Sequence, residues 1–200
     1  MTDLIDKNYF LALAEEDPRE VCKRGVCTYN TANEYYELAV WDDYYRIYPS
    51  EYRIESVNAN THSLHDYFYL VIIYYILKAR EIEVANEWIS EKDLPGGTTF
   101  FRGPHTIPSD LISSRFEGDI DGFRERCEQL NGAPLNMADI AFVFRITPRI
   151  PVAVLYWESD DEFPAESKLL FDKTIKEHFT LDIVYALAVA VCDRLGKATD

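Results

Sequence analysis

Residues 139–157 read DIAFVFRITPRIPVAVLYW and contain two runs rich in β-branched and aromatic residues. Such runs favour strands, and the proline-containing segment 147–150 between them predicts a turn. We therefore expect residues 139–146 and 151–157 to form an antiparallel hairpin. Because the second run is apolar at almost every position, we expect that strand to be fully buried.

The residues after this hairpin predict two helices. WESDDEFP at residues 157–164 is expected to turn into a helix that begins at Pro164 and reaches about Asp172, since proline is favoured in a first helical turn. Residues 181–195 are apolar on nearly every face, which is typical of a buried helix. Thr180 is the expected cap of this last helix, and Gly196 its end.

The N-terminal part changes from a helical to a β pattern. Residues 4–24 carry a loose apolar stripe and predict a helix that restarts at Pro18. Residues 26–57 place tyrosines and β-branched residues between short turns, which predicts an antiparallel meander. Residues 67–77 are the longest apolar run, and they predict a central helix reaching about residue 82.

Together these elements predict an α+β fold. We expect one domain over residues 1–200, with an N-terminal helix and β-meander in residues 1–58. Its antiparallel sheet is split into the N-terminal meander and the C-terminal hairpin, packed with the central apolar helix and the C-terminal helices. Between these parts, residues 98–101 predict a further short strand, and residues 119–130 a short helix.

The charge balance argues against two classes of partner. The chain carries 35 Asp and Glu against 20 Lys and Arg, for a formal net charge of −15. Affinity for nucleic acid or anionic lipid comes mostly from cations, so we expect no nucleic acid and no membrane. The longest apolar run has eleven residues, whereas a membrane span needs about 20. With no leader pattern at the N-terminus, we expect a cytoplasmic protein that binds a protein partner or a small molecule.

The cysteines give no cofactor signature. Cys22 and Cys27 have the spacing that begins one ferredoxin pattern, but the third cysteine of that pattern is missing. Cys127 and Cys192 lie in helical patterns where a thiol packs as a small apolar group. We expect structural thiols and no iron–sulfur cluster in this chain.

The densest group of carboxylates follows the buried strand directly. Residues 158–162 read ESDDE, and Trp157 ends the strand before them. Asp160 and Glu162 are candidates for general acid–base catalysis, and a weak signal for binding a metal ion through oxygen. The alternative is an exposed acidic turn with no chemical task.

A second candidate is the loop LPGGTTFFRGPH at residues 94–105. Gly96 and Gly97 would let a backbone approach a ligand closely, and the Arg102 guanidinium would hold an anion. Arg149 is a further candidate for anion binding. A simple turn explains the same glycines without a ligand.

The histidines could shuttle protons, although no nucleophile motif accompanies them. His105 follows the glycine loop, and His178 lies in a turn before the last helix. His62 and His65 have a spacing that could hold one metal ion, but no third ligand is in register. Each histidine has the alternative of a hydrogen-bonded turn residue.

Three blocks resemble the family DUF3786, a domain of unknown function found mainly in anaerobic bacteria and archaea. They are residues 87–97 (EWISEKDLPGG), residues 142–172, and the following stretch with the final helix. The resemblance covers about residues 60–196 and is most specific in PVAVLYWESDDEFP. The residues that match the family pattern are Trp88, Gly97, Arg149, Pro151, Trp157, Asp160, Glu162, Phe163, Pro164, Phe171, Asp172 and His178.

The resemblance implies a context and no mechanism. Some family members carry an N-terminal iron–sulfur domain like that of corrinoid iron–sulfur proteins, and the cysteine-rich module of those members is absent from this sequence. The resemblance therefore implies the cytoplasm of an anaerobe and a place near iron–sulfur or corrinoid-linked metabolism.

We expect an accessory module that binds a small ligand or a protein with the loop 95–105 and the strand end 157–162 around one pocket. The candidate binding residues are Trp88, Gly96, Gly97, Arg102, His105, Arg149, Trp157, Asp160, Glu162 and His178. One alternative is a small, metal-assisted or carboxylate-dependent enzyme that uses Asp160, Glu162 and a histidine. Another is a structural subunit of a larger complex, with an exposed aromatic patch in residues 35–52.

Overall fold

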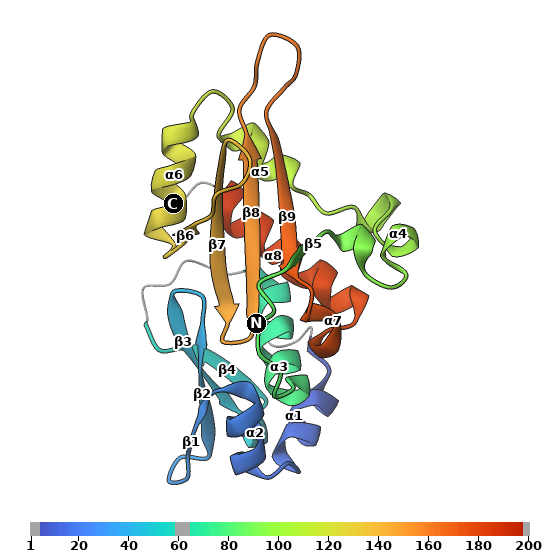
Figure 1. The fold of residues 1–200 in the computed structure, drawn as a ribbon. Coiled ribbons are helices and arrows are strands. Elements are labelled where there is room, and N and C mark those ends of the chain that lie inside the picture. The colour runs from blue at the N-terminus through green and yellow to red at the C-terminus, as the bar shows by residue number, and fades with distance from the viewer. Residues whose placement is uncertain (1–4, 59–64, 198–200) are drawn as a thin grey trace.

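The computed structural model describes residues 5–58 and 65–197. The chain forms two antiparallel sheets with helices packed against them, which confirms the α+β fold (Figure 1). The strands are β1 (Thr28–Asn30), β2 (Tyr35–Val40), β3 (Asp43–Tyr48), β4 (Arg53–Ser56), β5 (Trp88–Ile89), β6 (Ala133–Pro134), β7 (Ile140–Thr147), β8 (Ile150–Trp157) and β9 (Glu166–Asp172). The α-helices are α1 (Lys7–Ala14), α2 (Pro18–Gly25), α3 (Asp66–Lys78), α4 (Gly97–Phe100), α5 (Asp110–Arg115), α6 (Ile120–Gln129), α7 (Ile175–His178) and α8 (Leu181–Gly196). Single 3-10 turns are η1 (Pro49–Glu51), η2 (Glu91–Asp93) and η3 (Gly103–His105).

The larger sheet has the strand order β5-β9-β8-β7-β6. The predicted hairpin is its centre, because β7 and β8 pair antiparallel from Ile140 opposite Tyr156 to Thr147 opposite Ile150. Most of β8 is buried, as its apolar sequence predicts.

The prediction of a helix from Pro164 to Asp172 is wrong, because residues 166–172 form strand β9. Ser167 and Leu169 are buried while Glu166 and Lys168 are exposed, and this alternation is the period of a half-buried strand. The proline that suggested a helix start lies in the loop before the strand. Pairing of β9 with residues 152–157 of β8 fixes it in the sheet.

The predicted strand at residues 98–101 is also wrong, since residues 97–100 form the single-turn helix α4. Gly96 has a φ of +81°, a conformation that reverses the chain ahead of the helix. The N–H of Phe100 then donates to the carbonyl of Gly96 at 3.0 Å. Two adjacent threonines favour a strand locally, but four residues are too few to show a period.

The long apolar helix is central, as predicted. In α3, Val71, Ile72 and Ile76 are fully buried, and they belong to one core with residues of α8 and of both sheets. The helix ends at Lys78 and not near residue 82, because an extended segment at residues 79–87 leads on to β5. None of the helices in the described ranges is long and apolar enough to cross a membrane.

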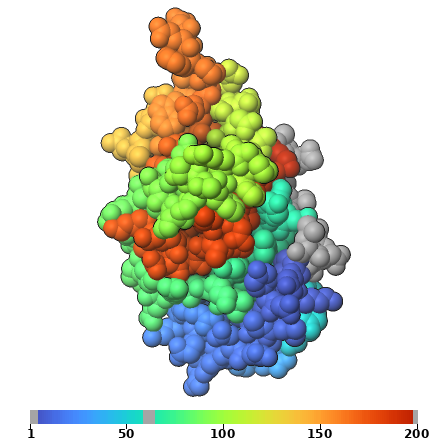
Figure 2. All heavy atoms as spheres, turned by 90° about the vertical axis from the view of Figure 1, so that its right-hand side faces the viewer, coloured from blue at the N-terminus to red at the C-terminus, as the bar shows by residue number. Residues whose placement is uncertain are grey.

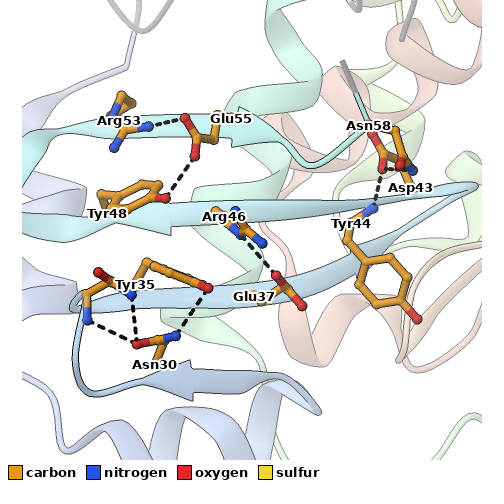
Figure 3. A network of polar contacts seen from close by, with 11 residues as sticks. Asn30, Tyr35, Glu37, Asp43, Tyr44, Arg46, Tyr48, Arg53, Glu55 and Asn58 are labelled. Atoms are coloured by element: carbon orange, nitrogen blue, oxygen red, sulfur yellow. Dashed lines mark hydrogen bonds and ion pairs between the residues drawn. The ribbon is translucent and has the colours of Figure 1, made fainter. Parts of the chain in front are cut away.

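The smaller sheet is the predicted meander, with the order β1-β2-β3-β4. Tyr36 and Tyr45 face the core, while Tyr35 and Tyr48 lie on the outer face among ion pairs (Figure 3). The Arg53 guanidinium lies 3.7 Å from the ring centre of Tyr48, and Arg46 covers Tyr35 at 5.0 Å. Arginines therefore cover Tyr35 and Tyr48, whereas Tyr44 in the same segment is 54% exposed.

Candidate functional site

The acidic segment 158–162 lies at the tip of the hairpin that joins β8 to β9. Figure 2 shows this tip projecting from one end of the molecule. The Asp160 Oδ1 accepts hydrogen bonds from the N–H groups of Glu162 and Phe163, both at 2.8 Å. These bonds lower the pKa of Asp160, so the carboxylate is ionised and holds the turn.

The hollow at the tip is lined by four carboxylates, those of Asp139, Glu158, Asp160 and Glu166. Asp160 and Glu162 are exposed, and Trp157 is half-buried beneath them. The hollow beside Trp157 and Asp160 has a volume of about 590 Å³, and no described histidine lines it. Phe163 is 67% exposed, so the tip presents an aromatic ring together with its carboxylates.

The two adjacent glycines have structural reasons for their identity. Gly96 needs its positive φ to start α4. A Cβ on Gly97 would lie 2.0 Å from the Glu91 carbonyl oxygen, so the close approach here is between two parts of the same chain. These contacts explain both glycines without a ligand.

The polar residues of the same loop separate into two environments. His105 stacks on Phe100 with the ring centres 4.5 Å apart, and its edge meets Tyr185 at 5.3 Å. Arg102 instead is exposed and lines a cleft beside β9. Of these two side chains, Arg102 is therefore the one that lines a cleft.

Arg149 is buried and fastens the segment 79–87 to the rest of the fold. Its Nε donates to the Arg24 carbonyl at 2.8 Å, and its guanidinium also donates to the Ile82 carbonyl at 3.0 Å. The exposed Glu83 carboxylate lies 3.2 Å away. With these partners, the side chain joins the end of α2 to the segment and does not face an open anion site.

Asp172 and His178 fasten the same segment. The Asp172 carboxylate accepts hydrogen bonds from the N–H groups of Ala85 and Asn86 at 3.1 and 2.6 Å, and the neighbouring Trp88 pairs with Asp172 in the sheet. Burial alone would raise the pKa of Asp172, but these bonds and those from Thr174 lower it.

His178 is 4% exposed, and its Nδ1 accepts the Arg80 N–H at 3.2 Å. Its Nε2 is buried with no hydrogen-bond partner among the described residues. Burial, with Arg149 and Arg80 nearby, lowers the pKa of His178. The imidazole is therefore neutral near pH 7 and has a structural role in this position.

A cleft with a volume of about 590 Å³ lies beside β9, and we call it the β9-edge cleft. One wall is residues 166–169 of the strand, and the other comes from residues 91–109. Phe101 and Ile107 give the second wall apolar surface, and the backbone carbonyl of Ser109 accepts the Ser167 hydroxyl at 2.5 Å.

Three exposed cations line this cleft, namely Lys92, Arg102 and Lys168. In the part of the chain that the structure describes, none of them has a carboxylate within 4.0 Å. The Asp93 carboxylate is nevertheless near enough to Lys168 that the lysine's charge adds to the Ser90 hydrogen bonds in lowering the pKa of Asp93. Glu91 and Glu166 are its acidic lining residues. The lining has one more cation than anions, although the whole chain has a net charge of −15.

Sequence reasoning found Arg102 but missed Lys92 and Lys168. The sequence predicts that Lys168 lies on a helix, where the side chains beside it would be those three and four residues away in sequence. The alternation of buried and exposed residues in ESKLLFD is the signal that could have shown a strand. Nothing in the local sequence shows that residue 168 lies beside residues 92 and 102.

The four cysteines are free thiols. Cys22 and Cys27 meet at the end of α2, where the Cys27 N–H donates to the Cys22 carbonyl at 3.2 Å in a capping motif around Val26. Burial raises the pKa of both thiols, which disfavours the thiolate. In the described ranges, His, Cys, Asp and Glu form no group of three that could hold a metal ion, and His62 lies outside those ranges.

The fold and this site define an α+β protein with two antiparallel sheets and a cationic cleft beside a strand of the larger sheet. A family model for a domain of unknown function (DUF3786) matches residues 17–194. The chain belongs to this family, which confirms the resemblance seen in its sequence. The match also includes the meander, N-terminal to the region where the resemblance was expected. No curated protein and no solved structure matches the chain.

Proposed function

We propose that this chain is a non-catalytic accessory module that binds a negatively charged ligand or protein segment in the β9-edge cleft. The observation that carries the proposal is the group of three cations, Lys92, Arg102 and Lys168, without paired carboxylates in a strongly acidic chain. An acidic chain has many carboxylates with which to neutralise its cations. Three that form no close ion pair around one cleft can therefore attract an external anion, with the charge of Lys168 shared between the cleft and Asp93.

The lining suits recognition of a ligand with both charge and carbon surface. The Arg102 guanidinium can donate a pair of hydrogen bonds to one carboxylate or phosphate, and lysines add flexible point charges. Phe101, Ile107 and Leu169 supply apolar contacts, and such a mixture is typical of binding sites.

Binding accounts for the arrangement better than turnover does. A carboxylate-dependent enzyme needs an acid, a base and a substrate position within hydrogen-bond reach of one another. Here Asp160 holds a turn at the hairpin tip, His105 stacks on Phe100, and His178 is buried against residues 79–87. These candidates occupy three separate environments.

The proposal includes a cellular context that rests on the family resemblance. We place the module in the cytoplasm of an anaerobe, in iron–sulfur or corrinoid-linked metabolism. There it would hold an acidic partner or metabolite for another protein.

Charge reversal tests this function. The double variant R102E/K168E is expected to retain at least tenfold less acidic partner or ligand than the wild type, because it replaces two cations of the cleft. The control K78E/K176E changes the net charge equally at exposed lysines that do not line the cleft. The measurement is native mass spectrometry, with quantitative affinity capture, of protein from the organism that encodes it.

The control variant is expected to retain what the wild type retains. Equal retention by R102E/K168E, or a wild type that carries no acidic molecule or partner, would contradict the proposal.

A further inference from the structure

Two thiols meet where α2 ends. The Cys27 N–H donates to the Cys22 carbonyl at 3.2 Å, around Val26 with a φ of +52°. In this capping motif the side chains of the two bonded residues lie close together. Burial raises the pKa of both thiols, and the hydrogen bond between them adds to this effect in Cys27 and opposes it in Cys22. Cys27 is therefore the donor of that bond and Cys22 the acceptor.

The backbone between the two cysteines is fixed to the core. The Arg149 Nε donates to the Arg24 carbonyl at 2.8 Å, and the buried Tyr75 hydroxyl donates to the Gly25 carbonyl at 3.1 Å. A disulfide needs Cα atoms about 4.4–6.8 Å apart, a range that two residues joined by a backbone hydrogen bond can meet. The fold therefore holds the two thiols where a disulfide between them can form.

The pair is accessible from two hollows in the surface. Cys22 and Cys27 are half-buried, and both line a hollow of about 630 Å³ that includes residues of β2 and β7. Both also line a second hollow, of about 520 Å³, beside the start of α2. Cys127 and Cys192, by contrast, are 0% exposed. A small molecule can therefore reach the first two thiols but not the two in the core.

We propose that Cys22 and Cys27 form a redox site that reduces low-molecular-weight disulfides. The Cys22 thiol loses its proton to solvent, and its sulfur attacks one sulfur of the disulfide R–S–S–R, which breaks that bond and releases one thiolate. The Cys27 thiol then loses its proton, and its sulfur attacks Cys22 in the mixed disulfide and displaces the second thiolate. The two released thiolates take up the two protons. Two protein thiols thus become one disulfide, and R–S–S–R becomes two R–SH.

The surroundings of the two sulfurs assign the first attack to Cys22. The hydrogen bond from Cys27 stabilises the Cys22 thiolate, which is the nucleophile in exchange. The Cys27 Sγ instead lies 3.9 Å from the Val21 carbonyl oxygen, whose partial negative charge disfavours a thiolate there. Because burial raises the pKa of both thiols, the thiolate is a minor species at neutral pH and the exchange is slow.

Treatment of the reduced full chain with glutathione disulfide tests the inference. The reaction is stopped with acid, the remaining thiols are alkylated in denaturant, and the chain is analysed by mass spectrometry. We expect a chain that has lost two hydrogens and carries alkyl groups only on Cys127 and Cys192. Trypsin cleaves after Lys23 and Arg24, so the peptides that contain Cys22 and Cys27 stay together only if a disulfide joins them.

Single variants separate the two roles. Cys27→Ser keeps the attacking thiol but lacks the second one, so we expect it to stop at a stable mixed disulfide on Cys22. Cys22→Ser is expected to react at least tenfold more slowly than Cys27→Ser. The variant R102E/K168E, changed only in the β9-edge cleft, should be oxidised like the wild type, so this test is independent of the proposed function.

Four alkylated thiols in the treated wild type would overturn the proposal. A mixed disulfide that persists on Cys22 of the wild type would do the same, because it would show that Cys27 cannot reach it. Equal rates in the two single variants would overturn the order of attack. Oxidation of Cys127 or Cys192 at the rate of the pair would show that the reaction needs an unfolded chain, which also contradicts a site formed by the fold.

Discussion

At position 97 the packing of one short loop against another allows only glycine. A Cβ there would approach the Glu91 carbonyl oxygen to 2.0 Å and Leu94 Cβ to 3.3 Å. The first contact is with backbone, which cannot move aside as the end of a side chain can. Because Lys92 lies in η2 and Arg102 follows α4 by two residues, this contact also helps to set the positions of both cations.

We expect Gly97→Ala to lower the free energy of unfolding by about 1–3 kcal/mol, the usual cost of forcing extra atoms into a packed site. Gly25→Ala is the control, since its added Cβ would have Cys27 Sγ at 3.7 Å as its nearest neighbour in ordinary contact. Urea denaturation of both variants measures the difference. A loss no larger than that of Gly25→Ala would show that the loops separate easily.

At the scale of elements, residues 79–87 are an extended segment held by side chains from other parts of the fold. Arg149, Asp172 and His178 each bond to its backbone. A segment without a ladder of its own needs such partners for its N–H and C=O groups. It leads directly into β5, so these three residues fix where β5 pairs with β9.

His178 makes the stability of this segment depend on pH. Its pKa in the folded protein is lowered from the ordinary 6.5 by burial, so below that pH the unfolded chain takes up a proton before the folded chain does. Stability is therefore complete above about pH 6.5 and is lost as pH falls through the lowered pKa. The slope is at most about 1.4 kcal/mol per pH unit.

Urea denaturation between pH 7.5 and 5.5 measures this loss. We expect His178→Gln to flatten the decline, because glutamine keeps an acceptor for Arg80 but does not titrate. His105→Gln, at the exposed histidine of the stacked loop, should keep the wild-type slope. An unchanged slope in His178→Gln would show that other groups cause the decline.

At the scale of the whole molecule, the net charge of −15 acts on folding and on binding with opposite signs. Like charges repel more strongly in the compact state, and one pair 10 Å apart in water costs about 0.4 kcal/mol. Salt screens this repulsion, and it equally screens the attraction between the cationic cleft and an acidic peptide.

Raising NaCl from 10 to 150 mM shortens the Debye length from about 30 to about 8 Å. We expect the free energy of unfolding to rise by on the order of 1 kcal/mol, while the retention of an acidic ligand in the β9-edge cleft falls. Urea denaturation and native mass spectrometry at both salt concentrations measure the two effects. A fall in stability would mean that surface ion pairs such as Arg46–Glu37 outweigh the repulsion.

The local sequence determined those parts of the fold whose signals are complete within a short window. The hairpin β7–β8, the meander and the two apolar helices each have a period long enough to identify, and their burial follows from apolar content. β9 and α4 were missed, since a proline and two threonines gave local cues that pairing with β8 and the turn at Gly96 overrode.

Only the tertiary structure decided which polar residues serve the fold and which remain open. Arg149 and His178 were candidates from their residue types, yet both are buried against backbone that is distant in sequence. Lys92, Arg102 and Lys168 line one cleft because residues 91–109 pack beside β9. This packing is set by contacts between segments that are distant in sequence, so no local pattern of charge or hydropathy encodes it.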